Sequence, residues 1–126
     1  MLATHMETTI QSYKDLVVWQ KSMNLVVMIY KLSETFPKTE IYGLVSQMRR
    51  CSVSIPSNIA EGKLRGSRKD FRHFLTIAFG SGAELETQLE IAKRLNYSKP
   101  ENFVDIDQTL LEVMKMLNKF IYSLSA

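Results

Sequence analysis

The stretch from Ser46 to Arg72, SQMRRCSVSIPSNIAEGKLRGSRKDFR, decides the fold of this chain. Its first half repeats an apolar residue at every third or fourth position, which is the spacing of one helix face: Met48, Cys51, Ile55 and Ile59. Gly62 is a suitable helix stop. Ser67 then has the character of an N-cap, with Asp70 three residues later as in a capping box. The stretch therefore predicts two consecutive helices joined by a short turn.

Positive charge gathers at this predicted turn. Five cations stand within ten residues, offset only by Asp70: Lys63, Arg65, Arg68, Lys69 and Arg72. A helix N-terminus carries partial positive charge, so each cation placed there is disfavoured by a few tenths to ~1 kcal/mol. Between residues 38 and 73 there are eight Lys or Arg and three Asp or Glu. We interpret the cluster as an anion site, with nucleic-acid phosphate as the leading candidate.

The composition sets the class of protein. A chain of 126 residues is long enough for one domain with a core of its own. Its single cysteine, Cys51, excludes a disulfide framework and any CxxC site. No run approaches the ~20 apolar residues that span a membrane, so we expect a cytoplasmic protein with no membrane partner. Residues 1–12 are expected to be disordered or tag-like, and residues 13–124 to form the folded domain.

Helical periodicity extends over the whole domain. Apolar residues recur at helical spacing over about 15–35, 44–61, 67–95 and from Pro100 to Leu124. Pro56 lies inside the second segment, where we expect a kink, with Ser52 or Ser54 helping to satisfy the freed carbonyl. Short connections between long helices favour antiparallel neighbours. The sequence predicts an all-α, up-down-up-down four-helix bundle.

Two features suggest contacts beyond a single bundle. Gly80 and Gly82 lie in the middle of the third helix, where each costs roughly 1 kcal/mol, so we expect another backbone to approach closely there. The first and last helices each carry a second apolar stripe, more than a lone bundle needs. These extra residues are either scattered surface hydrophobes or an interface between copies, and we favour the interface.

Arg49 and Arg50 are further candidates for phosphate binding. They stand about 100° apart on the second helix, so the core cannot hold both. The alternative is that Arg50 pairs with a carboxylate such as Glu61 or Glu84. Phe71 and Phe74 are the aromatic residues among the cations, and both fit the core stripe better than a base-stacking platform. We therefore expect recognition of the nucleic-acid backbone or shape without base-specific readout.

Polar residues at apolar positions form a second constellation: Asn58, Glu61, Glu84 and Gln88. Glu84 and Gln88 continue a stripe of the third helix that is otherwise suited to burial, and a buried carboxylate must be paired or hydrogen-bonded. The constellation is either a structural network that sets the register between helices or subunits, or a set of solvated side chains.

Catalytic patterns do not fit this sequence. A di-iron bundle needs Glu-x-x-His pairs, and neither His5 nor His73 follows a glutamate by three residues. Cys51 lies on the apolar face of its helix and resembles a small core residue. The chain has no GxSxG, HExxH or P-loop motif. We predict no catalytic residue, metal or cofactor.

Two long segments carry a resemblance to a known family: SQMRRCSVSIPSNIAEG (Ser46–Gly62) and GSGAELETQL (Gly80–Leu89). They resemble the bacterial four-helix-bundle proteins encoded in intervening sequences of 23S ribosomal RNA, to which the accessory variability protein of diversity-generating retroelements is similar. YKDLVVWQKSMNLVVMIYKL (Tyr13–Leu32) and IYGLVSQMRR (Ile41–Arg50) match the opening pattern of the family. The resemblance extends from about Tyr13 to Leu124.

The resemblance implies an antiparallel bundle that assembles into a ring, a homopentamer. The retroelement relative is a basic pentamer that binds nucleic acid and works with a reverse transcriptase, which implies a possible protein partner of that kind. The expected function is therefore a non-enzymatic, homo-oligomeric binder of RNA or DNA. The alternative is a protein-interaction scaffold whose basic face docks an acidic protein.

Overall fold

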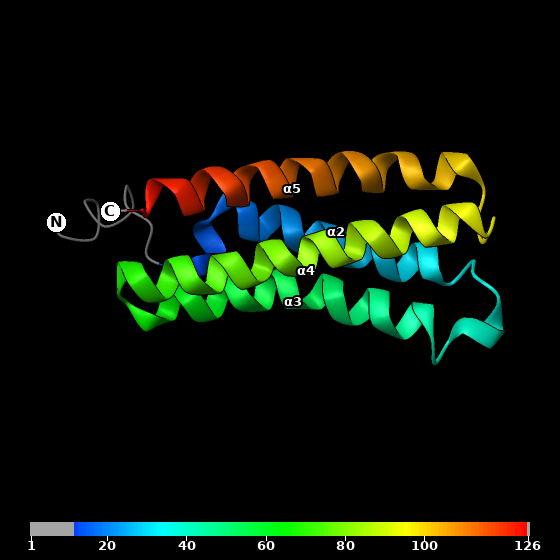
Figure 1. Cartoon of the computed structure of the whole chain (residues 1–126), viewed down its shortest axis with the longest axis horizontal. Helices are drawn as coiled ribbons and strands as arrows, with labels where there is room; N and C mark the ends of the chain where they lie inside the picture. Colours follow the sequence, from blue (N-terminus) through cyan, green and yellow to red (C-terminus); the bar gives the residue numbers. More distant parts are fainter. Residues whose placement is uncertain (1–11, 126) are drawn as a thin grey trace, which may run out of the picture.

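The structure, a computed structural model, describes residues 12–125. It contains four long α-helices: α2 Val17–Ser33, α3 Leu44–Arg65, α4 Arg68–Arg94 and α5 Val104–Ser123. Short 3-10 helices precede α2, α3 and α5: η1 Tyr13–Asp15, η2 Lys38–Glu40 and η3 Pro100–Phe103. The described residues contain no strand, so the chain is an all-α four-helix bundle (Figure 1).

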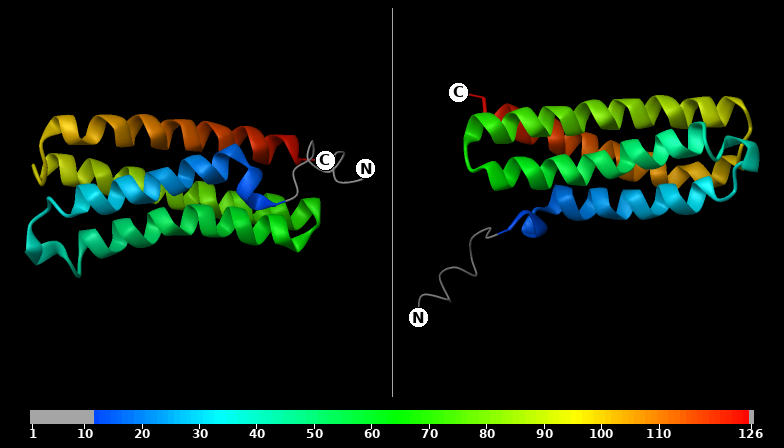
Figure 2. Two further views of the ribbon diagram at one scale, coloured as in Figure 1. Left: turned by 180° about the vertical axis from the view of Figure 1, so that it is seen from behind. Right: turned by 90° about the horizontal axis from the view of Figure 1, so that it is seen from below.

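Each helix packs on two neighbours. α3 contacts α2 and α4, and α5 also contacts α2 and α4. α2 and α4 are therefore diagonal to each other, and they lie on opposite sides of the bundle with α3 between them in the right-hand view of Figure 2. The α3–α4 turn lies at one end of the bundle, whereas the α2–α3 and α4–α5 connections lie at the other (Figure 1).

The core is built from the main apolar stripe of every helix, as predicted. Its fully buried large side chains come from all four helices: Leu25, Ile29, Met48, Ile55, Ile59, Leu75, Leu85, Leu89 and Leu117. Of the two apolar stripes of the first long helix, the one that contains Leu25 and Ile29 is buried, whereas Met23 (40% exposed) and Tyr30 (41% exposed) of the other stripe point outward. In α5 the extra residue Leu111 is 46% exposed. Part of the surplus apolar surface thus lies on the outside of the described chain, whereas Met114 and Ile121 of α5 are partly buried against the core.

The prediction that Gly62 ends the second helix is wrong. α3 continues to Arg65, and Gly66 provides the left-handed C-cap with φ of 86°. Gly62 is buried, and a Cβ atom there would lie 2.7 Å from the Cβ of Phe74. The residue is glycine because α3 and α4 approach each other closely at this point. Sequence alone could not distinguish a stop from a close helix contact.

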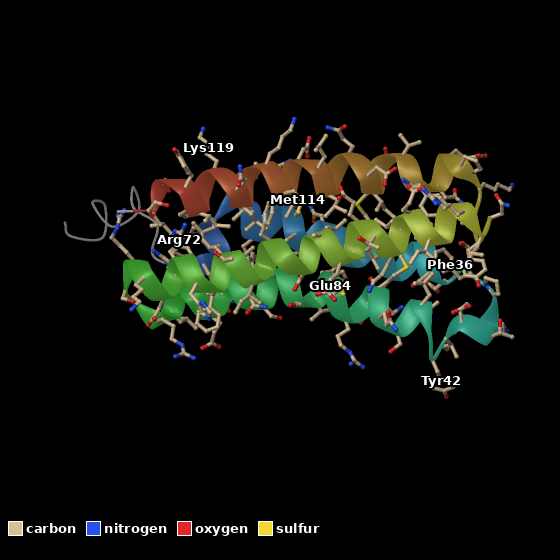
Figure 3. All side chains as sticks on the ribbon, in the orientation of Figure 1. Phe36, Tyr42, Arg72, Glu84, Met114 and Lys119 are labelled. Atoms are coloured by element: carbon tan, nitrogen blue, oxygen red, sulfur yellow. The ribbon has the colours of Figure 1, made fainter. Side chains whose placement is uncertain are left out.

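The predicted backbone approach at Gly80 and Gly82 does not occur within the chain. A Cβ on Gly80 would meet nothing within 4 Å in the described part of the structure. A Cβ on Gly82 would collide with Met114, which belongs to α5 and projects between α4 and α5 (Figure 3). Gly82 therefore makes room for a side chain, and Gly80 is open to the surface.

Two smaller expectations also need correction. Pro56 lies within α3, but the Ser52 hydroxyl donates to the carbonyl of Arg49 (2.9 Å), not to the carbonyl that the proline leaves free. The fourth helix does not start at Pro100 as an α-helix, because residues 100–103 form η3 and α5 begins at Val104. The predicted tail, residues 1–12, lies outside the described residues except for Ser12, which caps η1.

Hydrogen bonds to Glu40 link the α2–α3 and α4–α5 connections at the end of the bundle opposite the α3–α4 turn. The Tyr97 hydroxyl donates to Glu40 Oε2 (2.6 Å), and the backbone N–H of Leu44 donates to Glu40 Oε1 (3.1 Å). The bond from Tyr97, followed by that from Leu44, lowers the pKa of Glu40. The same carboxylate raises the pKa of Tyr97. Within residues 12–125, no helix is both long enough and apolar enough to cross a membrane.

Candidate nucleic-acid interface

The five cations of the sequence cluster surround the α3–α4 turn. Lys63 and Arg65 belong to the last turn of α3, and Arg68 and Lys69 open α4. Cations at a helix C-terminus are favoured by the helix dipole, so the electrostatic penalty falls on Arg68 and Lys69 and not on the whole cluster. The Ser67 hydroxyl caps α4 by accepting from the N–H of Asp70 (3.1 Å), as predicted.

Three of these cations make polar contacts that leave donors free. Arg65 Nε pairs with Glu61 at 2.9 Å, and both side chains are 52% exposed. Such an exposed pair at i,i+4 spacing contributes only about 0.3–0.5 kcal/mol, so a phosphate could compete for the arginine. Arg68 donates to the carbonyl of Ser123 (3.1 Å) and Arg72 to the hydroxyl of Ser125 (3.2 Å). A guanidinium has five N–H donors, so most remain available.

Aromatic rings support the side chains on the α3 side of the turn. Lys63 Nζ lies 5.8 Å from the ring centroid of Phe71, and the Arg65 guanidinium lies 5.0 Å from that of Phe74. Phe71 is buried, and Phe74 is half-buried. The rings therefore anchor the stems of the cations and do not form an open stacking platform, in agreement with the prediction.

The last helix adds positive charge at this end. Lys119 is exposed on α5, and Figure 3 shows it at the same end of the bundle as Arg72. Because α5 is about fifty residues from the α3–α4 turn in sequence, the charge run did not reveal it. Lys119 could have been found only by knowing that the C-terminus of α5 packs beside the N-terminus of α4. The hydrogen bonds from Arg68 to Ser123 and from Arg72 to Ser125 show this packing.

Arg49 and Arg50 are not part of this cluster. Arg49 stands sixteen residues before Arg65 on the same helix, a separation of about 24 Å at 1.5 Å per residue. Arg49 Nε donates to the Ser33 hydroxyl (2.9 Å), and its guanidinium lies 4.6 Å from the ring centroid of Tyr30. Arg50 is exposed. The seven predicted cations thus form two groups.

A hollow that the sequence did not suggest lies beside this second group. It has a volume of about 460 Å³ between α2, the α2–α3 connection and α3. Its lining joins segments far apart in sequence: Tyr30, Ile41, Tyr42, Val45, Ser46, Arg49, Arg50 and Val53. Tyr42 projects from the bundle near the start of α3 (Figure 3).

The second constellation divides between buried and exposed residues. Gln88 is buried, whereas Glu84 and Glu61 are exposed, so of the two alternatives Glu84 and Glu61 follow the solvated one. Gln88 Nε2 donates to the Cys51 sulfur (3.4 Å), and its Oε1 atom is buried without a partner in the described structure. Asn58 donates to the carbonyl and hydroxyl of Ser54. Glu61 pairs with Arg65, as described above, and not with Arg50.

One serine pair and one thiol complete the α3–α4 contact. The hydroxyls of Ser54 and Ser81 lie 2.8 Å apart, so Asn58, Ser54 and Ser81 link the two helices in a polar chain. Burial raises the pKa of the Cys51 thiol, which keeps it protonated and weakly nucleophilic at neutral pH. This part of the constellation is a structural network between α3 and α4.

A second hollow, of about 710 Å³, lies between α4 and α5. Four of its five charged side chains are paired, with Lys93 Nζ 2.7 Å from Asp107 Oδ2 and Arg94 Nε 3.0 Å from Glu90 Oε2. Among residues 12–125, no three His, Cys, Asp or Glu side chains gather in a group that could hold a metal ion. Both cations of this hollow are therefore occupied in ion pairs, one across and one along the helices.

The comparisons with known proteins agree with this architecture. Residues 14–119 match the model of the 23S rRNA-intervening sequence protein family. The chain is also similar to a crystal structure of a protein of unknown function from the S23 ribosomal protein family of Bacteroides thetaiotaomicron. The two share 31% sequence identity with a TM-score of 0.75, over 83% of this chain and 98% of the other. No curated protein matches the chain. The bundle, and a family match that covers most of it, place this chain in the 23S rRNA-intervening sequence protein family.

Proposed function

We propose that this protein is a non-enzymatic, homo-oligomeric bundle that binds nucleic acid through the cations of the α3–α4 turn. The observation that carries the proposal is the group Arg68, Lys69 and Arg72 at the start of α4, at the end of the bundle where Figure 3 also shows Lys119 of α5. Lys69 is fully available, since no hydrogen bond or ion pair joins it to another described residue. The setting is the reducing cytoplasm, in which the single Cys51 stays unpaired.

The described contacts favour phosphate over base recognition at this turn. Four of its five cations are exposed and Lys63 is half-buried, the neighbouring rings support the cations, and no base-stacking surface stands among them. Backbone phosphates bind such clusters without sequence preference and release counterions as they do so. The bundle itself is up-down-up-down and antiparallel, which the alternating ends of the three connections support (Figure 1).

Assembly into a ring is supported by two different apolar surfaces on opposite sides of the bundle. Met23 and Val27 are exposed on α2, and Ile77 and Ile91 are exposed on α4, with the exposed Leu95 as its C-cap. Because α2 and α4 are diagonal, these surfaces face in opposite directions. Contact between unlike surfaces is heterologous and closes into a ring when the rotation permits; the family resemblance implies that this ring is a pentamer. A ring repeats each basic patch and so multiplies weak phosphate contacts through effective concentration.

The test of nucleic-acid binding is fluorescence anisotropy with a labelled 16-base-pair RNA duplex and the matching DNA duplex across a salt series. Five phosphate contacts predict a slope of log K against log salt of about −4.5 for a duplex. Reversal of Lys63, Arg65, Arg68 and Lys69 to glutamate removes four contacts and is expected to bring the slope to about −1.

The matched control reverses four cations at the opposite end of the bundle: Lys31, Lys38, Arg94 and Lys99. Each variant replaces four positive charges by four negative ones, so the net charge falls by eight in both, from +3 to −5. The control is expected to keep most of the wild-type slope. Equal losses in both variants would show that total charge, and not the turn, controls binding. Absence of wild-type binding at low salt would favour the alternative, a scaffold that docks an acidic protein.

Ring assembly is tested by mixing two variants. Val27→Glu disables the α2 surface and Ile91→Glu the α4 surface, so each variant alone is expected to be monomeric by light scattering. In a heterologous arrangement, the mixture regains one intact contact and forms dimers without rings. A wild-type protein that is monomeric at micromolar concentration, or an assembled Val27→Glu variant, would refute this arrangement.

A further inference from the structure

We propose that the hollow lined by Tyr30, Tyr42, Arg49 and Arg50 binds unpaired nucleotides by stacking their bases and pairing with their phosphates. The inference rests on the proposed function and adds a second, chemically different contact to it. The hollow lies on the α2–α3 face near the N-terminus of α3, whereas the cations of the turn lie at the α3 C-terminus.

The lining matches the two halves of a nucleotide. Val45 is buried and forms an apolar floor, and Ile41 and Val53 are 51% and 39% exposed beside it. Two tyrosine rings border this surface, and two guanidinium groups stand on the α3 side. A flat base gains stacking and apolar contact from the first set, and a phosphate gains charge-assisted hydrogen bonds from the second. The residues that line the hollow include no carboxylate that would repel a phosphate.

Arg49 is held in place before any ligand binds. Its Nε donates to the Ser33 hydroxyl, one of its terminal nitrogens donates to the Tyr30 carbonyl (3.4 Å), and its guanidinium lies over the Tyr30 ring. The stacked pair of Tyr30 and Arg49 presents a flat, positively charged surface with little conformational freedom left to lose. Such preorganisation lowers the entropic penalty of binding.

Tyr42 and Arg50 are the free members of the hollow. Tyr42 is 95% exposed, so its ring adds almost no buried area to the fold of the chain. No hydrogen bond or ion pair joins the Arg50 side chain to another described residue, although Glu84 was a predicted partner. An unpaired guanidinium and an uncovered aromatic ring at one hollow point to a ligand that is both anionic and flat. Stacking on tyrosine tolerates any base, which agrees with binding that is not sequence-specific.

The experiment compares two labelled probes by fluorescence anisotropy at one salt concentration: a 12-nucleotide oligouridylate and a blunt 16-base-pair RNA duplex. Tyr42→Ala is expected to weaken oligouridylate binding by about fivefold or more, as loss of one stacking ring does, and duplex binding by less than twofold. Tyr42→Phe is expected to retain oligouridylate binding, because it keeps the ring. Tyr122→Ala is the matched control, since Tyr122 is 81% exposed on α5 and lies outside the hollow.

The outcomes separate this inference from the proposed function. If the Tyr42→Ala and Tyr122→Ala variants bind oligouridylate equally well, the hollow is not a nucleotide site, although duplex binding through the turn would stand. If neither probe binds the wild-type protein, the proposed function fails together with this inference. Light scattering of the Tyr42→Ala variant completes the test, because a change of assembly state would assign the hollow to contact between copies and overturn the nucleotide site.

Discussion

The three helical glycines respond to their surroundings so differently that the same substitution should change stability in opposite directions. A glycine-to-alanine change in a helix interior gains about 1 kcal/mol from backbone propensity alone. At Gly80 nothing else opposes this gain, because the described chain leaves the Cβ position open. We expect Gly80→Ala to stabilise the protein by about 0.5–1 kcal/mol.

At Gly62 the packing opposes the gain. A new Cβ would lie 2.7 Å from Phe74 Cβ and 3.1 Å from Phe71 Cδ1. The Phe74 Cβ is attached to the α4 backbone and cannot rotate away, so α3 and α4 must separate. Overpacking of this kind costs about 1–3 kcal/mol. Taking its upper half and subtracting the propensity gain, we expect Gly62→Ala to destabilise the protein by about 1–2 kcal/mol, or roughly 4–8 °C in Tm.

Gly82 is the internal comparison. A Cβ atom at Gly82 would clash with the flexible end of the Met114 side chain, which can move. The stability of Gly82→Ala should therefore lie between the stabilities of Gly80→Ala and Gly62→Ala. The assay is urea unfolding followed by circular dichroism, at two protein concentrations so that association is separated from folding. A Gly62→Ala variant as stable as the wild type would refute the close approach of α3 and α4. A destabilised Gly80→Ala variant would refute the open surface there.

Two further predictions concern polar contacts. Gln88→Met removes a buried amide oxygen without a partner, so the free energy of unfolding should stay equal or rise by up to about 1 kcal/mol in the same urea assay; a loss above about 2 kcal/mol would show that the amide is satisfied in the assembled protein. Tyr97→Phe removes the hydrogen bond that lowers the pKa of Glu40. The stability that this bond gives the wild-type protein should be complete above the ordinary carboxyl pKa of 4.5 and should be lost as the pH falls through the lowered pKa of Glu40. The carboxylate also raises the pKa of Tyr97. The stability difference between the wild type and Tyr97→Phe should therefore also be lost at alkaline pH, as the pH rises through the raised pKa of Tyr97. Urea unfolding of both proteins from pH 3 to 11 checks this, and a difference that does not change with pH would contradict it.

The candidate site was only partly accessible from sequence. The cluster from Lys63 to Arg72 is contiguous, so a reader of the sequence can find it without a fold. Lys119 and Tyr30 could not be assigned, because they reach their neighbours through helix pairing. Glu84 and Gln88 show a different limit. They stand four residues apart on one helix, yet Gln88 is buried against α3 and Glu84 is exposed to solvent. The position of the neighbouring helix, which the sequence pattern does not give, decides which residues at the edge of an apolar face are buried.

By itself, the sequence determined the helical class, the main core stripes, the Ser67 cap and the charge cluster, because each depends on residues within a few turns of one another. The tertiary structure alone decided why Gly62 is glycine and that Tyr42 joins Arg49 and Arg50 around a hollow. These properties depend on distances between helices and on the direction of side chains across a contact. Local spacing carries no information about either, since packing of the whole bundle sets them.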